Sequence, residues 1–134
     1  MADLKTFARR IRAIGRRVEE NADAGAVQTA LAVDQAVVVA TPVDTGRARG
    51  NWQAQIGSPV REETNTTDKG GQATIDRNEG IIRSRRGTSE IYISNNVPYI
   101  GRLNEGSSSQ APENFVQIAV QAGVRAVHKL RLTR

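Results

Sequence analysis

Residues 41–52 read TPVDTGRARGNW and separate a helical pattern before them from a mixed pattern after them. Pro42 has no amide hydrogen and disfavours helical angles in the residue before it, so we expect an incoming helix to end here. Asp44 and Gly46 favour a tight turn, because an aspartate can accept backbone amides and glycine tolerates positive φ. Trp52 then begins an apolar–polar alternation, which predicts a strand with one buried face.

The composition sets bounds on fold and function. The chain has 134 residues, a net charge of +5, no cysteine, 38% hydrophobic and only 4% aromatic residues. This length predicts a single domain over residues 1–134, and the composition predicts a thin core that invites stabilisation by a partner or by self-assembly. Without cysteine, and with His128 as the single histidine, we expect no disulfide, no metal and no cofactor. The sequence lacks apolar runs typical of a signal peptide or a membrane span, so we expect synthesis in the cytoplasm and no membrane partner.

The residues before the turn favour one long N-terminal helix. Apolar side chains recur there at spacings of three and four: Leu4, Phe7, Ile11, Ile14 and Val18. Smaller residues continue the pattern to Ala40, and Gly25 marks a candidate kink. If unbroken, the helix is on the order of 55 Å long and needs cover from outside its own chain. Its face of Ala30, Val33 and Val37 is a candidate for close packing, within the subunit or across an interface.

The residues after the turn predict a small antiparallel sheet. Segments 50–57 and 89–95 read as strands, with 97–103 as a candidate third. The polar stretch 58–88 is expected to be a mobile loop or insertion between the first two strands. Within it, residues 72–86 form a candidate short helix.

A second helix is predicted at the C-terminal end. Pro112 suits a first helical turn, and Glu113 complements the positive end of the helix dipole. An apolar stripe follows: Val116, Ala119, Val120, Gly123, Val124 and Val127. The fold class is therefore α+β, with a long N-terminal helix, a small antiparallel β-sheet and a C-terminal helix packed on the sheet.

No catalytic pattern stands out. Residues 44–46 match the Asp-Thr-Gly triplet of aspartic proteases, but that triplet follows an apolar strand in those enzymes, whereas here it follows a helix. The turn interpretation is favoured, and we expect no enzyme. Trp52 is expected to anchor the core, and Tyr99 to lie in the core or an interface.

The basic residues leave an alternative open. Arginines gather in two places: Arg9, Arg10, Arg16 and Arg17, then Arg83, Arg85 and Arg86. A solvated face explains them, but a small basic nucleic-acid-binding module is an alternative function. Acidic residues lie among them, and no known DNA-binding motif accompanies them.

Two ordered blocks resemble a known family. Residues 41–52 resemble the P-V-D-T-G-x-L-x-x-S-W signature of the HK97 gp10-like tail-component family of tailed bacteriophages. Residues 91–116 are similar to its Y-A-x-x-x-E-x-G-x-S-x-x-A-P-x-x-F block, through Tyr99, Glu105 and Ala111-Pro112. Ala48 and Asn51 depart from the first pattern, and residues 60–86 match no part of the family pattern.

The resemblance implies a structural virion protein. Such proteins act at the phage neck or tail as tail-completion, tail-terminator or head–tail connector subunits. They form homo-oligomeric rings, commonly hexameric, around the DNA channel. The expected partners are further copies, neighbouring neck and tail proteins, and passing genomic DNA bound nonspecifically. The expected location is the virion, after assembly in the bacterial host cytoplasm. Arg47 and Glu105 are then candidates for an ion pair between elements or subunits.

Overall fold

The structure is a computed structural model that describes residues 23–132. Its elements are α2 (Asp23–Ala40), α3 (Arg47–Gly50), β1 (Trp52–Ile56), α4 (Gln72–Arg83), β2 (Ile91–Asn95), α5 (Ile100–Asn104) and α6 (Phe115–Leu132). The predicted apolar stripe of residues 4–18 lies outside the described residues.

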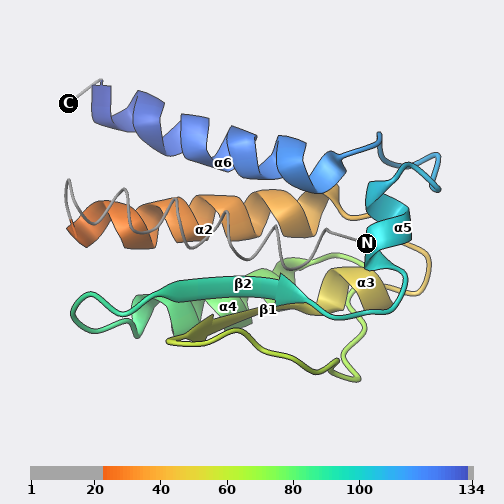
Figure 1. Cartoon of the computed structure of the whole chain (residues 1–134), viewed down its shortest axis with the longest axis horizontal. Coiled ribbons are helices and arrows are strands. Elements are labelled where there is room, and N and C mark those ends of the chain that lie inside the picture. The colour runs from red at the N-terminus through yellow and green to blue at the C-terminus, as the bar shows by residue number, and fades with distance from the viewer. Residues whose placement is uncertain (1–22, 133–134) are drawn as a thin grey trace.

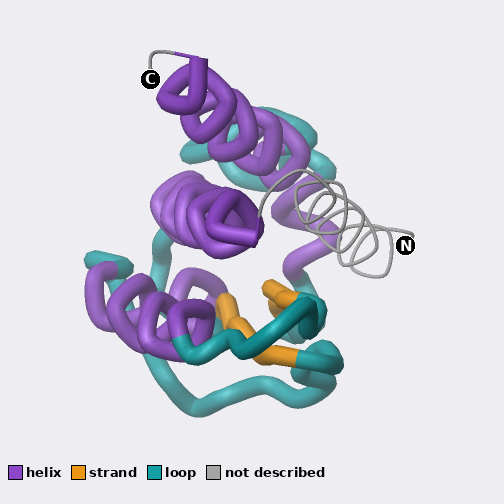
Figure 2. Tube along the Cα trace, turned by 90° about the vertical axis from the view of Figure 1, so that its left-hand side faces the viewer, coloured by secondary structure: helices purple, strands orange, loops and turns teal. Residues whose placement is uncertain are grey.

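The fold is α+β, as the sequence predicts, and it is built in three tiers. Helix α6 lies along α2, and α2 in turn lies on a tier made of the sheet and α4 (Figure 1). The view at right angles shows the same order, with α4 beside the strands (Figure 2). The C-terminal helix reaches the sheet region through its first residues, Phe115 and Val116, which join the core that contains Trp52 and Ile93. Most of its length covers α2 instead.

The sheet has two antiparallel strands. Trp52 pairs with Asn95, Ala54 with Ile93, and Ile56 with Ile91. The predicted alternation holds over the first four residues, since Trp52 and Ala54 are buried whereas Gln53 and Gln55 are half-buried. Ile56 is only partly buried. By contrast, all five residues of β2 are buried.

The candidate third strand at 97–103 is a wrong prediction, because a turn and α5 occupy this segment. The Asn95 side chain accepts the Val97 amide at 3.2 Å, and the Ile100 amide donates to the Val97 carbonyl at 3.2 Å. These local hydrogen bonds turn the chain away from the sheet. Pro98 also disfavours a third strand here, because it has no amide hydrogen to donate to a neighbouring strand.

Helix α6 begins at Phe115, three residues after the proline predicted to open it. Asn104 determines this start. Its carbonyl accepts the Asn114 amide at 2.7 Å, and its side-chain oxygen accepts the Val116 amide at 2.9 Å. The first-turn amides of a helix lack partners within the helix, and here a side chain from α5 supplies one.

The close-packing face of α2 is used within the subunit. Ala30, Val33 and Val37 are buried, with exposed fractions of 7%, 1% and 0%. A Cβ added to Gly123 of α6 would lie 2.8 Å from the Cα of Val33, so the two backbones approach closely at this point.

Residues 58–88 contain α4, as predicted, preceded by a segment with many contacts. Asn51 donates to the Thr64 carbonyl and accepts its amide, at 3.1 and 2.8 Å. Burial opposes ionisation of Asp68, but hydrogen bonds from Thr74 and Gly71 outweigh it and lower its pKa. Mobility of this stretch stays a prediction about solution behaviour. The inward side of α4 consists of Thr74, Asn78 and Ile82, whereas Ala73 is exposed.

A buried polar junction joins three elements. Asn78 of α4 donates to Asp34 of α2 at 2.9 Å and to the Trp52 carbonyl at 2.9 Å, and it accepts the Ala54 amide at 3.1 Å. Burial raises the pKa of Asp34 to about 7, against the Asn78 hydrogen bond and the charge of Arg77, which lower it. Because burial prevails, the folded chain holds Asp34 mostly protonated below about pH 7.

This raised pKa predicts a pH-dependent stability. The unfolded chain releases the Asp34 proton near pH 4, but the folded chain holds it to about pH 7, so stability falls as pH rises between these values and levels off above. Between pH 5 and pH 7 we expect the free energy of unfolding to fall by about 2 kcal/mol. Asp34→Asn should remove this fall, because an amide does not titrate in this pH range. The junction should stay intact, because the amide oxygen can still accept from Asn78. Urea unfolding at both pH values tests this, with Asp76→Asn on the exposed face of α4 as the control. Equal pH dependence in the wild type and Asp34→Asn would contradict it.

Candidate interaction surface

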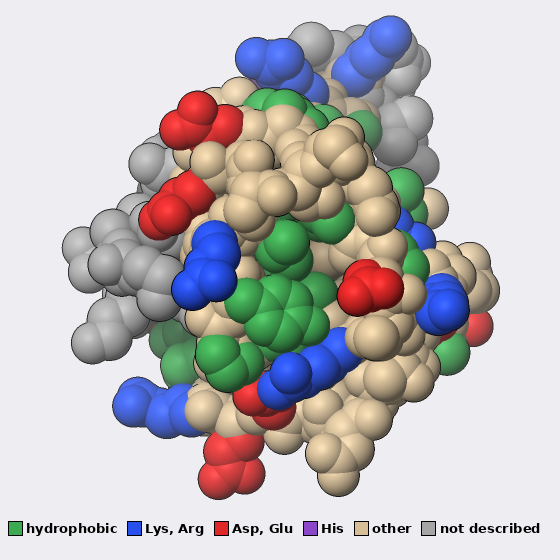
Figure 3. Space-filling view, turned by 90° about the vertical axis from the view of Figure 1, so that its right-hand side faces the viewer, with side chains coloured by type: hydrophobic (Ala, Val, Ile, Leu, Met, Phe, Trp, Pro, Cys, Tyr) green, Lys and Arg blue, Asp and Glu red, His purple; other side chains and the backbone are tan. Residues whose placement is uncertain are grey.

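The two blocks of the family resemblance meet at one end of the molecule. The meeting place, which we call the motif end, comprises residues 43–47 and four side chains from the second block: Tyr99, Leu103, Ser108 and Gln110. They line an open cavity of about 430 Å³. Figure 3 views this end of the molecule, where hydrophobic side chains lie among charged side chains of both signs.

Gln110 joins the two blocks directly. Its side-chain oxygen accepts the Val43 amide at 2.8 Å, and its side-chain nitrogen donates to the Val43 carbonyl at 2.8 Å. The Gln110 side chain thus satisfies both the amide and the carbonyl of Val43, as a paired backbone would in a sheet. The loop after α2 is therefore fastened to a loop 67 positions further along the chain.

We expect Gln110→Ala to loosen this end without unfolding the domain. Two exposed hydrogen bonds are lost, so the free energy of unfolding should fall by about 1 kcal/mol. The Val43 amide should exchange with solvent markedly faster in an NMR hydrogen-exchange measurement. Gln121→Ala, at an exposed position of α6, is the control. An unchanged exchange rate at Val43 would show that Gln110 does not hold the loop.

The turn itself is formed differently from the prediction. Gly46 has a φ of 89°, as expected for glycine, but Asp44 is exposed, and the Thr45 hydroxyl accepts the Arg47 amide at 3.2 Å. The Gly46 carbonyl accepts the amides of Gly50 and Asp68, at 2.9 and 3.0 Å. The turn therefore binds the segment before α4 through backbone groups.

Arg47 lies within this end but not beside its expected partner. Its guanidinium binds Glu63 at 2.5 Å and lies 5.5 Å from the centre of the Tyr99 ring. Within the chain, this pairing with Glu63 corrects the expected pair with Glu105, which is exposed just after α5. The segment around Glu63 carried no recognisable motif, so its partner role could not be seen in the sequence.

Trp52 takes the anchoring position that the sequence predicts. It is fully buried, and its indole nitrogen donates to the Thr41 hydroxyl at 2.7 Å. That hydroxyl donates to the Val37 carbonyl in the last turn of α2, at 2.6 Å. Trp52 thus ties the first strand to the end of the helix that precedes the turn.

Two further roles were not predicted. Arg49 donates to the carbonyls of Val39 and Thr41 at 3.0 and 2.8 Å, and so satisfies the carboxyl end of α2. Asn95 is fully buried and donates to the Ala48 carbonyl at 2.8 Å. Nothing in the sequence pattern distinguishes these two residues from exposed polar ones.

Across residues 23–132, no group of three or more His, Asp or Glu side chains is arranged to hold a metal ion. In the same part of the chain, no helix is long and apolar enough to cross a membrane. The basic group near the end of α4 is partly engaged, since Arg83 pairs with Glu79 at 3.0 Å and Arg85 donates to the Ser89 carbonyl.

No protein-family profile matches the chain, and searches of curated protein sequences and of solved structures find no significant similarity.

Proposed function

We propose that this chain is a structural virion protein of a tailed bacteriophage. Its role is that of a ring-forming neck or tail-completion subunit, whether tail terminator or head–tail connector, around the DNA channel. The observation that carries the proposal is the meeting of the two family-like blocks, fastened by Gln110 to Val43. Blocks that resemble one family in sequence order lie side by side in this structure, which supports the proposal that they form one architectural unit.

The chemistry of the motif residues supports an architectural role. Trp52 and Gly46 shape the fold, and Arg47 is held by Glu63 and Tyr99. None of these three lies in an arrangement that would transfer a proton or activate a nucleophile. We infer a homo-oligomer, six-fold by the family resemblance, with neighbouring neck and tail proteins as axial partners.

Contact with passing DNA is proposed to be weak and nonspecific. The net charge of +5 is modest, and two of the three arginines near the end of α4 already bind groups of the chain. Filter binding should therefore show a strong salt dependence without sequence preference. Tight, sequence-selective binding at physiological salt would favour the nucleic-acid-binding alternative.

Immunogold electron microscopy tests the proposed location. Antibody against the purified chain should label particles from the phage that encodes it at the head–tail junction or at a tail end. Label over the head shell alone, or unlabelled particles that contain no copy of the chain by mass spectrometry, would contradict the proposal. Particles that lack the chain by genetic deletion are the control for antibody specificity.

A further inference from the structure

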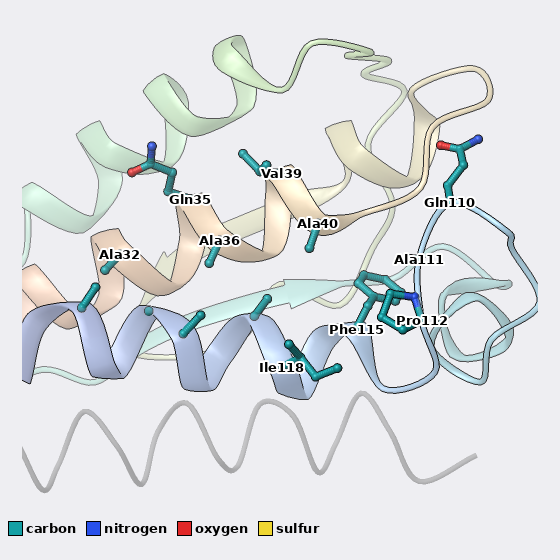
Figure 4. A pocket seen from close by; sticks show the side chains of 14 residues that line it. Ala32, Gln35, Ala36, Val39, Ala40, Gln110, Ala111, Pro112, Phe115 and Ile118 are labelled. Atoms are coloured by element: carbon teal, nitrogen blue, oxygen red, sulfur yellow. The ribbon is translucent and has the colours of Figure 1, made fainter.

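Helix α4 is held on the domain mainly by polar contacts. Of its twelve residues, three are buried, and Ile82 is the apolar one among them, beside Thr74 and Asn78. Figure 4 shows α6 on the other side of α2 from α4, so α4 packs chiefly against α2 and β1. An element that buries little apolar surface is among the first parts of a domain to open locally.

Asn78 of α4 occupies the outer edge of β1. Its side chain accepts the Ala54 amide at 3.1 Å and donates to the Trp52 carbonyl at 2.9 Å. The Gln55 amide points the other way, toward β2, because the backbone groups of successive strand residues alternate in direction. Helix α4 therefore covers a strand edge that would otherwise present unpaired backbone groups.

Asp34 of α2 holds Asn78 in this position. The Asn78 amide donates to the Asp34 carboxyl at 2.9 Å, and Asp34 is 2% exposed. A neutral carboxyl group can stay at such a place, whereas a buried carboxylate is costly unless it is paired. Because burial raises the pKa of Asp34 to about 7, the carboxyl ionises near neutral pH.

Arg77 is the charged group that acts on Asp34 from the elements around it. Its guanidinium donates to the carbonyls of Trp52 and Gly50, at 2.6 and 3.4 Å. Neither β1 nor β2 contains a charged residue, and α2 has one other, Asp23, at its first position. The other described charged side chains of the neighbouring helices are engaged or exposed: Arg47 with Glu63, Arg49 with carbonyls at the end of α2, Arg83 with Glu79, and Asp76, Arg125 and Lys129 in solvent. Among the described residues, an ionised Asp34 therefore has partial compensation from Arg77 and otherwise needs water.

The two ends of α4 are held differently. Asp68 caps the first turn, where its carboxylate accepts the Thr74 amide and hydroxyl at 2.8 Å each and the Gly71 amide at 2.9 Å. After the helix, the turn of residues 84–89 is largely exposed. The helix can therefore lift from its middle and its end while its first turn stays in place.

We propose that α4 is a pH-released cover over the outer edge of β1. When Asp34 ionises, the helix lifts from Asn78 onward, so the carboxylate reaches water and the Ala54 amide loses its acceptor. The two-stranded sheet and α2 stay folded. The released edge then presents backbone groups to which an added strand can pair. This device does not depend on the proposed role in the virion.

Hydrogen exchange of the full-length protein, followed residue by residue by NMR, tests this opening. After correction for the intrinsic effect of pH on exchange, the protection of the Ala54 amide should fall about thirtyfold between pH 5 and pH 7, because opening lets Asp34 release its proton. Ala54 should also be less protected than Gln55. Urea well below the unfolding transition should leave Ala54 unchanged, since local opening exposes little surface, but should lower the protection of Gln55.

A matched pair of variants assigns the pH dependence to one carboxyl group. In Asp34→Asn, the protection of the Ala54 amide should be the same at both pH values, because an amide does not titrate there. Asp76→Asn, on the exposed side of α4, should keep the thirtyfold fall of the wild type. The urea dependence of the wild type tests local opening without any variant.

Two results would overturn the proposal. The first is equal protection and equal urea dependence of Ala54 and Gln55, which would show that α4 leaves only when the whole domain unfolds. The second is an Ala54 protection that does not change between pH 5 and pH 7, or that falls equally in Asp34→Asn, which would show that Asp34 does not control the cover.

Discussion

Trp52→Ala is expected to cost about 3–5 kcal/mol of unfolding free energy, a large part of the stability of a domain this small. The side chain is fully buried and is the largest in a core that otherwise consists of Ala, Val and Ile together with Phe115. Its removal leaves a cavity, and it also leaves the Thr41 hydroxyl without the indole donor. We expect circular dichroism to show a chain that is largely unfolded, or that unfolds at a much lower urea concentration.

Trp52→Phe separates packing from hydrogen bonding. Phenylalanine keeps most of the aromatic volume but offers no donor to Thr41, so it should cost clearly less than Trp52→Ala. Urea unfolding followed by circular dichroism suits all three proteins, since the tryptophan signal is absent from two. A Trp52→Ala protein with the wild-type urea midpoint would show that this side chain does not anchor the core.

Gly46→Ala is expected to cost about 3 kcal/mol, the second largest effect. Alanine at a φ of 89° is strained by about 1–2 kcal/mol. An added Cβ would also lie 2.7 Å from the backbone nitrogen of Lys69 and 2.8 Å from backbone atoms of Asp68. This close approach adds an overpacking cost of about 1–3 kcal/mol.

Gly57→Ala is the matched control for this substitution. Its φ is 90°, but no atom lies within 4 Å of the added Cβ. The difference between the two variants therefore measures how tightly the segment before α4 packs on the turn. Equal urea midpoints for Gly46→Ala and Gly57→Ala would show that this segment moves aside freely.

The elements that sequence could predict are those with a local cause. Pro42 ends α2, the alternation from Trp52 predicts β1, and Gly46 takes the positive φ of a turn. Each depends on the residue type and its near neighbours, and so can be recognised without tertiary information.

The contacts that sequence could not predict depend on distant partners. Asp34 and Asn78 read as ordinary helical polar residues until α4 lies on α2, and Asn51 reads as the polar residue before a strand. The same holds for Arg47, which meets Glu63 because the segment before α4 folds over the turn. Polar residues of this kind give no periodic signal, since their burial is decided by which backbone groups need a partner.

The most direct test of the proposed role is electron microscopy of particles from a phage genome in which this chain is deleted. A neck or tail-completion subunit is required for joining or for tail length. We therefore expect separate heads and tails, or tails of abnormal length, with joined particles restored when the chain is supplied from a plasmid. Normal, infectious, joined particles from the deletion would contradict the role in neck or tail assembly.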